Sequence, residues 1–137
     1  MQINKDLIIE GTGKSLYDLT TTTKQGTTVS KNNTSDIAIS GSKVIHSTTL
    51  TINSGKALMI GSLYLKHDGG TPQVQFLVDG SNYGGFFASQ QNEVYSFSLV
   101  VSVSKGKHTF SLNVNQGNAS NVKVGGYTAS ELTVVEI

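Results

Sequence analysis

The stretch that decides the fold is residues 94–114, which read VYSFSLVVSVSKGKHTFSLNV. Hydrophobic residues occupy every second position from Tyr95 to Val103 and again from Phe110 to Val114, with Ser, Thr and Asn between most of them. Because successive side chains of a strand point to opposite faces, this period of two predicts two half-buried strands. The glycine-centred turn Lys105-Gly106-Lys107 separates them. A short turn between alternating runs predicts a β-hairpin.

Weaker copies of the same pattern occur along the chain. They cover Val44–Ile52, Ala57–Lys66, Val74–Val78, Tyr83–Ala88 and Leu132–Ile137, with turn residues at Asn53-Ser54-Gly55 and Asp79-Gly80-Ser81-Asn82. The run from Ala57 starts apolar on both faces, which is typical of a central strand. About seven or eight strands at intervals of about ten residues, without one long helix, predict an all-β, jelly-roll-type antiparallel β-sandwich.

The first 35 residues have a different character. After the apolar run Leu7-Ile8-Ile9 and a candidate short helical turn at Ser15–Leu19, the chain becomes threonine-rich and polar. Between positions 20 and 36 it has almost no core-forming residues, so this part cannot bury enough apolar surface to fold by itself. We therefore predict an N-terminal arm or linker at residues 1–35 and a β-sandwich domain at residues 36–137.

The composition excludes several classes of protein. The chain has 137 residues, and its charged fraction is 14%, against about 25% in ordinary globular proteins. All ten cations are lysines and the net charge is +1, so no strong positive field is present to attract nucleic acid. Cysteine is absent, which excludes disulfides and thiolate sites. Ser, Thr, Asn and Gln together exceed a third of the chain.

No targeting segment is evident in the sequence. The opening residues Met1–Asp6 lack an apolar core of signal-peptide length, and no apolar run approaches the length of a membrane span. We therefore expect synthesis in the cytoplasm without a signal peptide and without a transmembrane segment.

One segment superficially resembles a phosphate-binding loop. Gly11-Thr12-Gly13-Lys14-Ser15 ends in the Gly-Lys-Ser of such loops, but the motif requires a glycine five residues before Gly13, where Ile8 stands. The run of threonines that follows is also a poor continuation of a helix. We expect no nucleotide cofactor.

The three histidines are scattered along the chain. His46, His67 and His108 show none of the short spacings that bring two imidazoles to one metal ion. His46 and His108 fall on the apolar faces of their strands, where a histidine is more often a hydrogen-bonded core residue than a metal ligand. His67-Asp68 fits either half of a catalytic pair or a polar turn. We predict no metal site.

The acidic residues are isolated from one another, so nothing points to the paired carboxylates of a glycosidase. The turns beginning at Asp68 and Asp79 each offer one carboxylate, where calcium needs several oxygen ligands. No serine lies in the strained turn of a hydrolase nucleophile. We therefore predict no catalytic residues and no enzymatic activity.

Aromatic residues are the candidates for a ligand or subunit contact: Tyr83, Phe86, Phe87 and Tyr127. Neighbouring residues on a strand point to opposite faces, so one of Phe86 and Phe87 leaves the core. The exposed ring then forms a surface for a sugar or for another subunit; the alternative is a strand buried on both sides. The two-sided apolarity of Leu132–Ile137 favours packing between subunits.

Four segments of the chain resemble a known family. Residues 75–80 (QFLVDG), 95–99 (YSFSL), 103–112 (VSKGKHTFSL) and 129–136 (ASELTVVE) are similar to jelly-roll head domains of bacteriophage tail and receptor-binding proteins. Residues 7–19 (LIIEGTGKSLYDL) are similar to the anchoring stretches that precede such heads. This resemblance implies a non-enzymatic virion component, a homo-oligomer with a trimer favoured, that binds host-surface saccharides.

The sequence therefore predicts a phage or viral structural protein of tail, baseplate or receptor-binding type. In this hypothesis it self-assembles, contacts other virion proteins through its arm, and binds saccharides on the host surface. Two alternatives stay open: a monomeric carbohydrate-binding module, and a prophage lysis-associated accessory protein.

Overall fold

The computed structural model describes residues 27–31, 36–125 and 130–137, which form ten strands and no helix. The strands are β1 (Thr27–Lys31), β2 (Ile37–Ala38), β3 (Ser42–Ile52), β4 (Lys56–Lys66), β5 (Gln73–Val78), β6 (Ser81–Phe87), β7 (Glu93–Ser102), β8 (Gly106–Asn115), β9 (Lys123–Val124) and β10 (Glu131–Glu136). No helix able to cross a membrane exists within these ranges.

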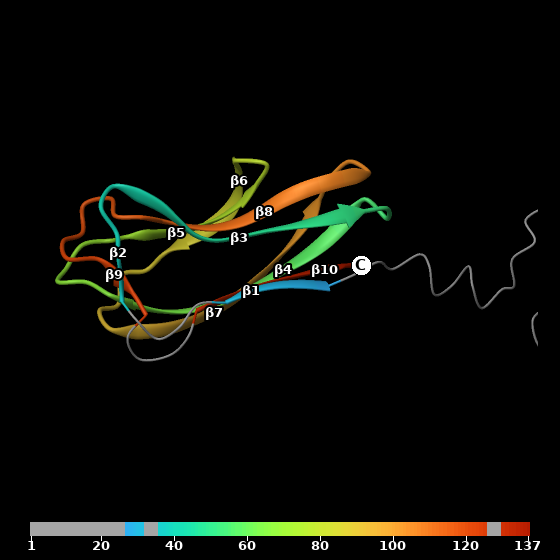
Figure 1. The fold of residues 1–137 in the computed structure, drawn as a ribbon. Coiled ribbons are helices and arrows are strands. Elements are labelled where there is room, and N and C mark those ends of the chain that lie inside the picture. Colours follow the sequence, from blue (N-terminus) through green and yellow to red (C-terminus); the bar gives the residue numbers. More distant parts are fainter. Residues whose placement is uncertain (1–26, 32–35, 126–129) are drawn as a thin grey trace, which may run out of the picture.

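The strands form two antiparallel sheets that lie one above the other (Figure 1). One sheet has the order β3-β8-β5-β6. In the other, β1, β10, β4 and β7 lie side by side. The two-residue strands β9 and β2 extend this second sheet where β4 runs beyond its pairing with β10. A four-stranded and a six-stranded sheet between which the chain crosses repeatedly give a jelly roll, as the alternation predicted.

The second sheet begins before residue 36. β1 pairs with β10 from Thr27↔Val135 to Lys31↔Glu131, so five residues of the segment expected to be an arm form an outer strand. β1 is held by backbone pairing with β10, so the pattern of apolar residues did not predict it. The helical turn expected at Ser15–Leu19 lies outside the described residues.

The predicted hairpin at residues 94–114 is wrong, although both of its strands are present. β7 pairs with β4 in one sheet, whereas β8 pairs with β3 and β5 in the other. The turn between them therefore crosses from sheet to sheet. The apolar faces of the two strands meet across the sandwich, and a sequence period of two does not distinguish this arrangement from pairing within one sheet.

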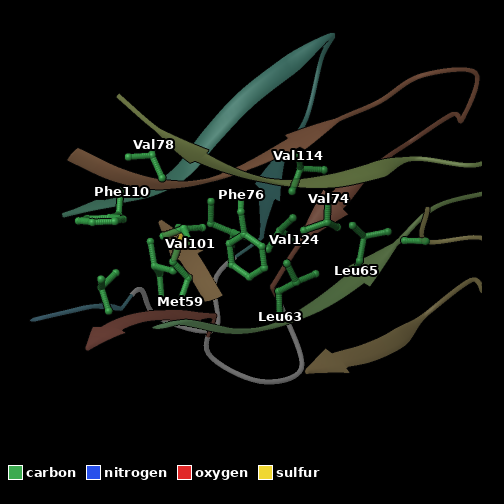
Figure 2. Packing of buried hydrophobic residues seen from close by; sticks show 14 of the residues in the cluster. Met59, Leu63, Leu65, Val74, Phe76, Val78, Val101, Phe110, Val114 and Val124 are labelled. Carbon is green, nitrogen blue, oxygen red and sulfur yellow. The ribbon is translucent and has the colours of Figure 1, made fainter. Parts of the chain in front are cut away.

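The core fills the space between the two sheets (Figure 2). Alternate residues of β4, such as Met59, Leu63 and Leu65, point inward and meet Phe76 of β5 and Val114 of β8. β4 has a hydrogen-bonded partner on each side, so the prediction of a central strand is confirmed. Among the described residues, no buried polar side-chain atom lacks a hydrogen-bond partner. The sandwich is thus a well-packed support for whatever its two outer faces carry.

Candidate functional site

Three of the four aromatic candidates, Tyr83, Phe86 and Phe87, lie on the second strand of the β5–β6 hairpin. Its two-residue turn, Asp79-Gly80, has positive φ at both positions, 50° and 84°. This is the backbone of a type I′ turn, which Asp-Gly sequences favour because its twist matches that of the flanking strands. β6 lies at the outer edge of its sheet, and its pairing with β5 shifts register after Phe76.

Phe86 points into the sandwich. It lies opposite the buried Val74, and its ring centroid is 5.3 Å from that of Tyr95 and 4.9 Å from that of Phe97. Phe97 also contacts Phe76, with ring centroids 4.8 Å apart. Edge-to-face packing of this kind stabilises a core. Phe86 therefore joins the two sheets at the β6–β7 side of the sandwich.

Phe87 points out, opposite Gln73 of β5, and 66% of it is exposed. The alternative of a strand buried on both sides is therefore wrong for the described chain. Tyr83, at the register shift, is 45% exposed. Tyr127 lies outside the described residues. The structure thus keeps Phe87 and Tyr83 on the surface and sends Phe86 into the core.

Beside Phe87, amide side chains form a connected row across the outer face of this sheet. Asn113 Nδ2 donates to Ser42 Oγ and to Gln75 Oε1, each at 2.9 Å, and Gln75 Nε2 donates to Gln73 Oε1 at 3.3 Å. We call Ser42, Gln73, Gln75, Gly85, Phe87 and Asn113 the amide face. The sequence predicted polar outward positions here but not their connection, because the four polar residues come from three strands.

The outer face of the other sheet is chemically different. Val135, Leu58 and Val100 lie in one cross-strand row, and Ile60 lies in the next row between Thr133 and Ser98. Val100 is 55% exposed, Val94 47% and Ile60 41%. We call Leu58, Ile60, Val100 and Val135 the aliphatic face; Val94 lies apart from it, opposite Tyr64 and two rows beyond Ile60. Exposed aliphatic side chains that adjoin one another mark interaction surfaces.

Asp79, His108 and Ser104 lie together in an order that resembles a hydrolase triad. His108 Nδ1 is 2.6 Å from Asp79 Oδ2, and His108 Nε2 is 2.7 Å from the Ser104 carbonyl oxygen. Both ring nitrogens therefore face acceptors and donate. The hydrogen bond to Asp79 raises the pKa of His108, and that to the Ser104 carbonyl adds to it. Because Nε2 points to the Ser104 carbonyl oxygen, it is poorly placed to accept the proton of Ser104 Oγ, which lies 3.4 Å away.

The other two histidines have structural roles. The Gly69 amide donates to His67 Nδ1 at 3.1 Å, so His67 Nε2 carries the proton and donates to the carbonyls of Ala88 and Gln90. His46 is buried, with Nε2 2.7 Å from Ser130 Oγ, and burial lowers its pKa. The interpretation of His46 as a hydrogen-bonded core residue is confirmed. Of the two alternatives for His67-Asp68, the hydrogen bonds of His67 favour the polar turn.

An open pocket of about 320 Å³ lies at the end of β4, next to this turn. It is lined by Lys66, His67, Asp68, Asn92, Asn121 and Lys123. Lys66 is paired with Asp36 at 2.8 Å, and Asn121 Nδ2 donates to Asp68. The described residues contain no group of three side chains able to hold a metal ion. Of the lining residues, Asn121 and Asp68 bond to each other, whereas Lys66 and His67 bond to residues outside the lining.

Comparisons with known proteins identify the fold. The sequence matches no family model and no curated protein. Among solved structures, a chain from the structure of infectious bursal disease virus (Gx strain) is similar, with a TM-score of 0.50 and 13% identity. The match covers 99% of this chain and 36% of the viral chain. The VP2 subviral particle of that virus gives 0.49 over the same shares, also at 13% identity. The C-terminal domain of EclA, a sugar-binding protein, gives 0.42 at 13% identity, over 80% of this chain and 77% of its own.

At 13% identity, the likeness to the Gx-strain chain, with its TM-score of 0.50, shows a shared fold alone. The chain spans about a third of the length of the viral chains it matches. Its jelly-roll β-sandwich therefore has the same fold as part of the Gx-strain viral chain.

Proposed function

We propose that this protein is a structural component of a phage or viral particle, of tail, baseplate or receptor-binding type, and that it assembles with copies of itself. The observation that carries the proposal is the aliphatic face. An enzyme or a simple soluble module gains nothing from exposed Ile60 and Val100 in adjacent rows beside the half-buried Leu58, since apolar surface left in water costs about 25 cal/mol per Å² relative to burial.

The edge of the same sheet supports self-assembly independently. β7 is ten residues long, and its only charged residue is Glu93 at the first position. Within the described part of the chain, β7 pairs with β4 alone. Monomeric proteins protect such edges with lysine, proline or bulges, because unpaired backbone groups recruit other strands. An unprotected edge next to an aliphatic face is typical of a surface that a neighbouring subunit covers.

Charge at the two ends of the aliphatic face fits a second copy of the same chain. Lys56 lies one row before Leu58, and Glu131 lies one row beyond Ile60, opposite Ser62. When two copies of this face meet in antiparallel orientation, Lys56 of one copy approaches Glu131 of the other. Complementary charges at the rim set the orientation of a contact whose centre is uncharged.

In this proposal, the part of the predicted arm that precedes β1, residues 1–26, attaches the sandwich to other virion proteins. The assembled form is a homo-oligomer, with a trimer favoured by the resemblance to phage head domains. The protein is located in the virion. In its receptor-binding role, the protein binds saccharides on the host surface.

The test is the subunit count of the full chain. We expect light scattering after size-exclusion chromatography to give a defined oligomer at micromolar concentration. Ile60→Lys and Val100→Lys place a charge in the centre of the aliphatic face and should shift the protein to monomer, because a buried unpaired charge opposes association.

Thr49→Lys is the matched control, since it adds the same charge at an exposed outward position of β3 on the opposite sheet. This variant should keep the wild-type oligomer. A clean monomer for the wild type at high concentration would overturn the proposal, as would variants of the aliphatic face that associate like the control.

The second candidate is a monomeric carbohydrate-binding module. The observation that favours it is the exposed Phe87 beside the amide row. A monomer that binds a glycan would support this candidate, whereas an oligomer that binds one would support the first.

A further inference from the structure

The amide face has a fixed internal order. Both protons of the Asn113 amide are used, one on Ser42 Oγ and one on Gln75 Oε1. This turns the Gln75 amide so that its nitrogen points to Gln73 Oε1. The donors therefore run in one direction across the sheet, from Asn113 to Gln75 to Gln73. Because Asn113 is only 6% exposed, the start of the row is held rigidly.

The row ends in unused hydrogen-bonding capacity. Gln73 Nε2 has no partner among the described residues, and Gln75 Nε2 uses one of its two protons. Both glutamines are only partly exposed, so their amides are oriented before any ligand arrives. Preorganised donors and acceptors lose little conformational entropy on binding.

A flat apolar surface stands next to these amides. Phe87 lies directly opposite Gln73, and two residues earlier on the same face Gly85 lies opposite Gln75. A Cβ at Gly85 would lie 2.1 Å from the Val74 carbonyl oxygen, so the close backbone approach requires glycine. As a result, no side chain of β6 stands beside Gln75, and the space next to the Phe87 ring stays open.

We propose that the amide face binds a neutral saccharide chain, with one sugar ring stacked on Phe87 and its hydroxyl groups bonded to the amides of Gln73 and Gln75. The negative face of an aromatic ring attracts the electropositive C–H groups of a sugar. Carboxamides suit hydroxyl groups because both partners donate and accept. This inference deepens the saccharide-binding part of the proposed function, and it does not depend on the aliphatic face.

The chemistry of the face favours neutral sugar over other ligands. None of its six residues is charged, so it offers no cation to phosphate, sulfate or carboxylate groups. It is also poorly suited to a protein partner, because the exposed apolar residues on and beside it, Phe87 of β6 and Val44 of β3, lie at opposite edges of the sheet. They do not form the contiguous apolar centre of most protein interfaces.

The test is an NMR titration of the full chain with maltohexaose, cellohexaose and chitohexaose, after screening on an array of neutral and acidic glycans. We expect saturable shifts of the side-chain amide signals of Gln73 and Gln75 with a neutral glycan. Phe87→Ala and Gln73→Leu should each weaken binding at least about fivefold, and Phe87→Tyr, which keeps the ring, should preserve it.

Ile60→Lys separates this inference from the proposed assembly. It should bind the glycan as the wild type does while its subunit count falls. No binding to any neutral glycan on the array or in the titrations would overturn the inference, and so would binding that is insensitive to Phe87→Ala and Gln73→Leu. A change of oligomeric state in Phe87→Ala without loss of glycan binding would assign the ring to a subunit contact instead.

Discussion

At the scale of single residues, two histidines respond to protons in opposite ways. His46 is enclosed between the sheets, and desolvation lowers its pKa below the ordinary value near 6.5. His108 lies between Asp79 and the Ser104 carbonyl, and the hydrogen bond to Asp79 raises its pKa above that value. The alternation of the sequence predicted both histidines on the apolar faces of their strands. Their pKa values shift in opposite directions because of their environments, which include hydrogen-bond partners 84 and 29 positions away in the sequence.

These shifts predict the pH dependence of stability. Because the folded state holds His46 neutral, its contribution is lost as the pH falls from about 6.5 through the folded pKa. Because the folded state favours charged His108, its contribution is lost as the pH rises from about 6.5 through the folded pKa. We expect the two together to favour stability near pH 6.5.

Urea unfolding between pH 5 and 8.5 measures this effect. In His108→Gln the decline above pH 6.5 should disappear, whereas in His46→Gln the decline below pH 6.5 should disappear. Since Asp79 is 53% exposed, the His108 effect should be small, about 0.5 kcal/mol. Unchanged slopes in both variants would show that neither interaction distinguishes the folded from the unfolded state.

At the scale of elements, the residues of a turn predicted which strands pair better than the alternation along the strands did. Asp79-Gly80 specifies its own two-residue turn, so the β5–β6 hairpin follows from a few adjacent residues. At Lys105-Gly106 only Gly106 has positive φ, 130°, which does not specify a two-residue hairpin, and β7 and β8 join different sheets there. The pairing of those strands depends on partners, β4 and β3, that lie far away in the sequence.

Gly61 of β4 shows how one position controls the contact of two strands. It lies opposite Phe97 of β7, and a Cβ built there would be 2.6 Å from Phe97 Cε2. The ring cannot move away easily because Phe76 and Phe86 pack against it. We predict that Gly61→Ala lowers the free energy of unfolding by about 1–3 kcal/mol, the usual cost of overpacking.

Urea unfolding checks this prediction, with Ser62→Ala as the control at the neighbouring outward position. The control should change stability by less than about 0.5 kcal/mol. Phe97→Leu in the Gly61→Ala background should recover part of the loss, because it removes the clashing ring atoms. Equal stability of Gly61→Ala and the wild type would contradict the tight contact.

At the scale of the whole molecule, the boundary of the sandwich is the open question. We predict that deletion of residues 1–26 leaves the unfolding transition unchanged but alters assembly or docking. Deletion of residues 1–35 also removes β1, so we expect the sandwich to fold with lower stability and with β10 exposed at the sheet edge. Circular dichroism and light scattering on the two truncations compare these outcomes.

The contrast between the two truncations is informative. Equal stability would mean that β1 adds nothing to the sandwich and that a domain boundary at residue 36 is adequate. Loss of cooperative unfolding in the shorter chain would mean that the domain begins at or before Thr27.

The sequence by itself determined the fold class, the position of most strands, the turn at Asp79-Gly80 and the divergence of Phe86 and Phe87. All of these depend on the period of two and on the backbone preferences of a few adjacent residues. Only the tertiary structure decided that β7 and β8 lie in different sheets, that β1 completes one of them, and that the amides of Asn113, Gln75 and Gln73 form one row beside Phe87. Strand pairing is set by contacts between distant residues, which a local pattern does not encode.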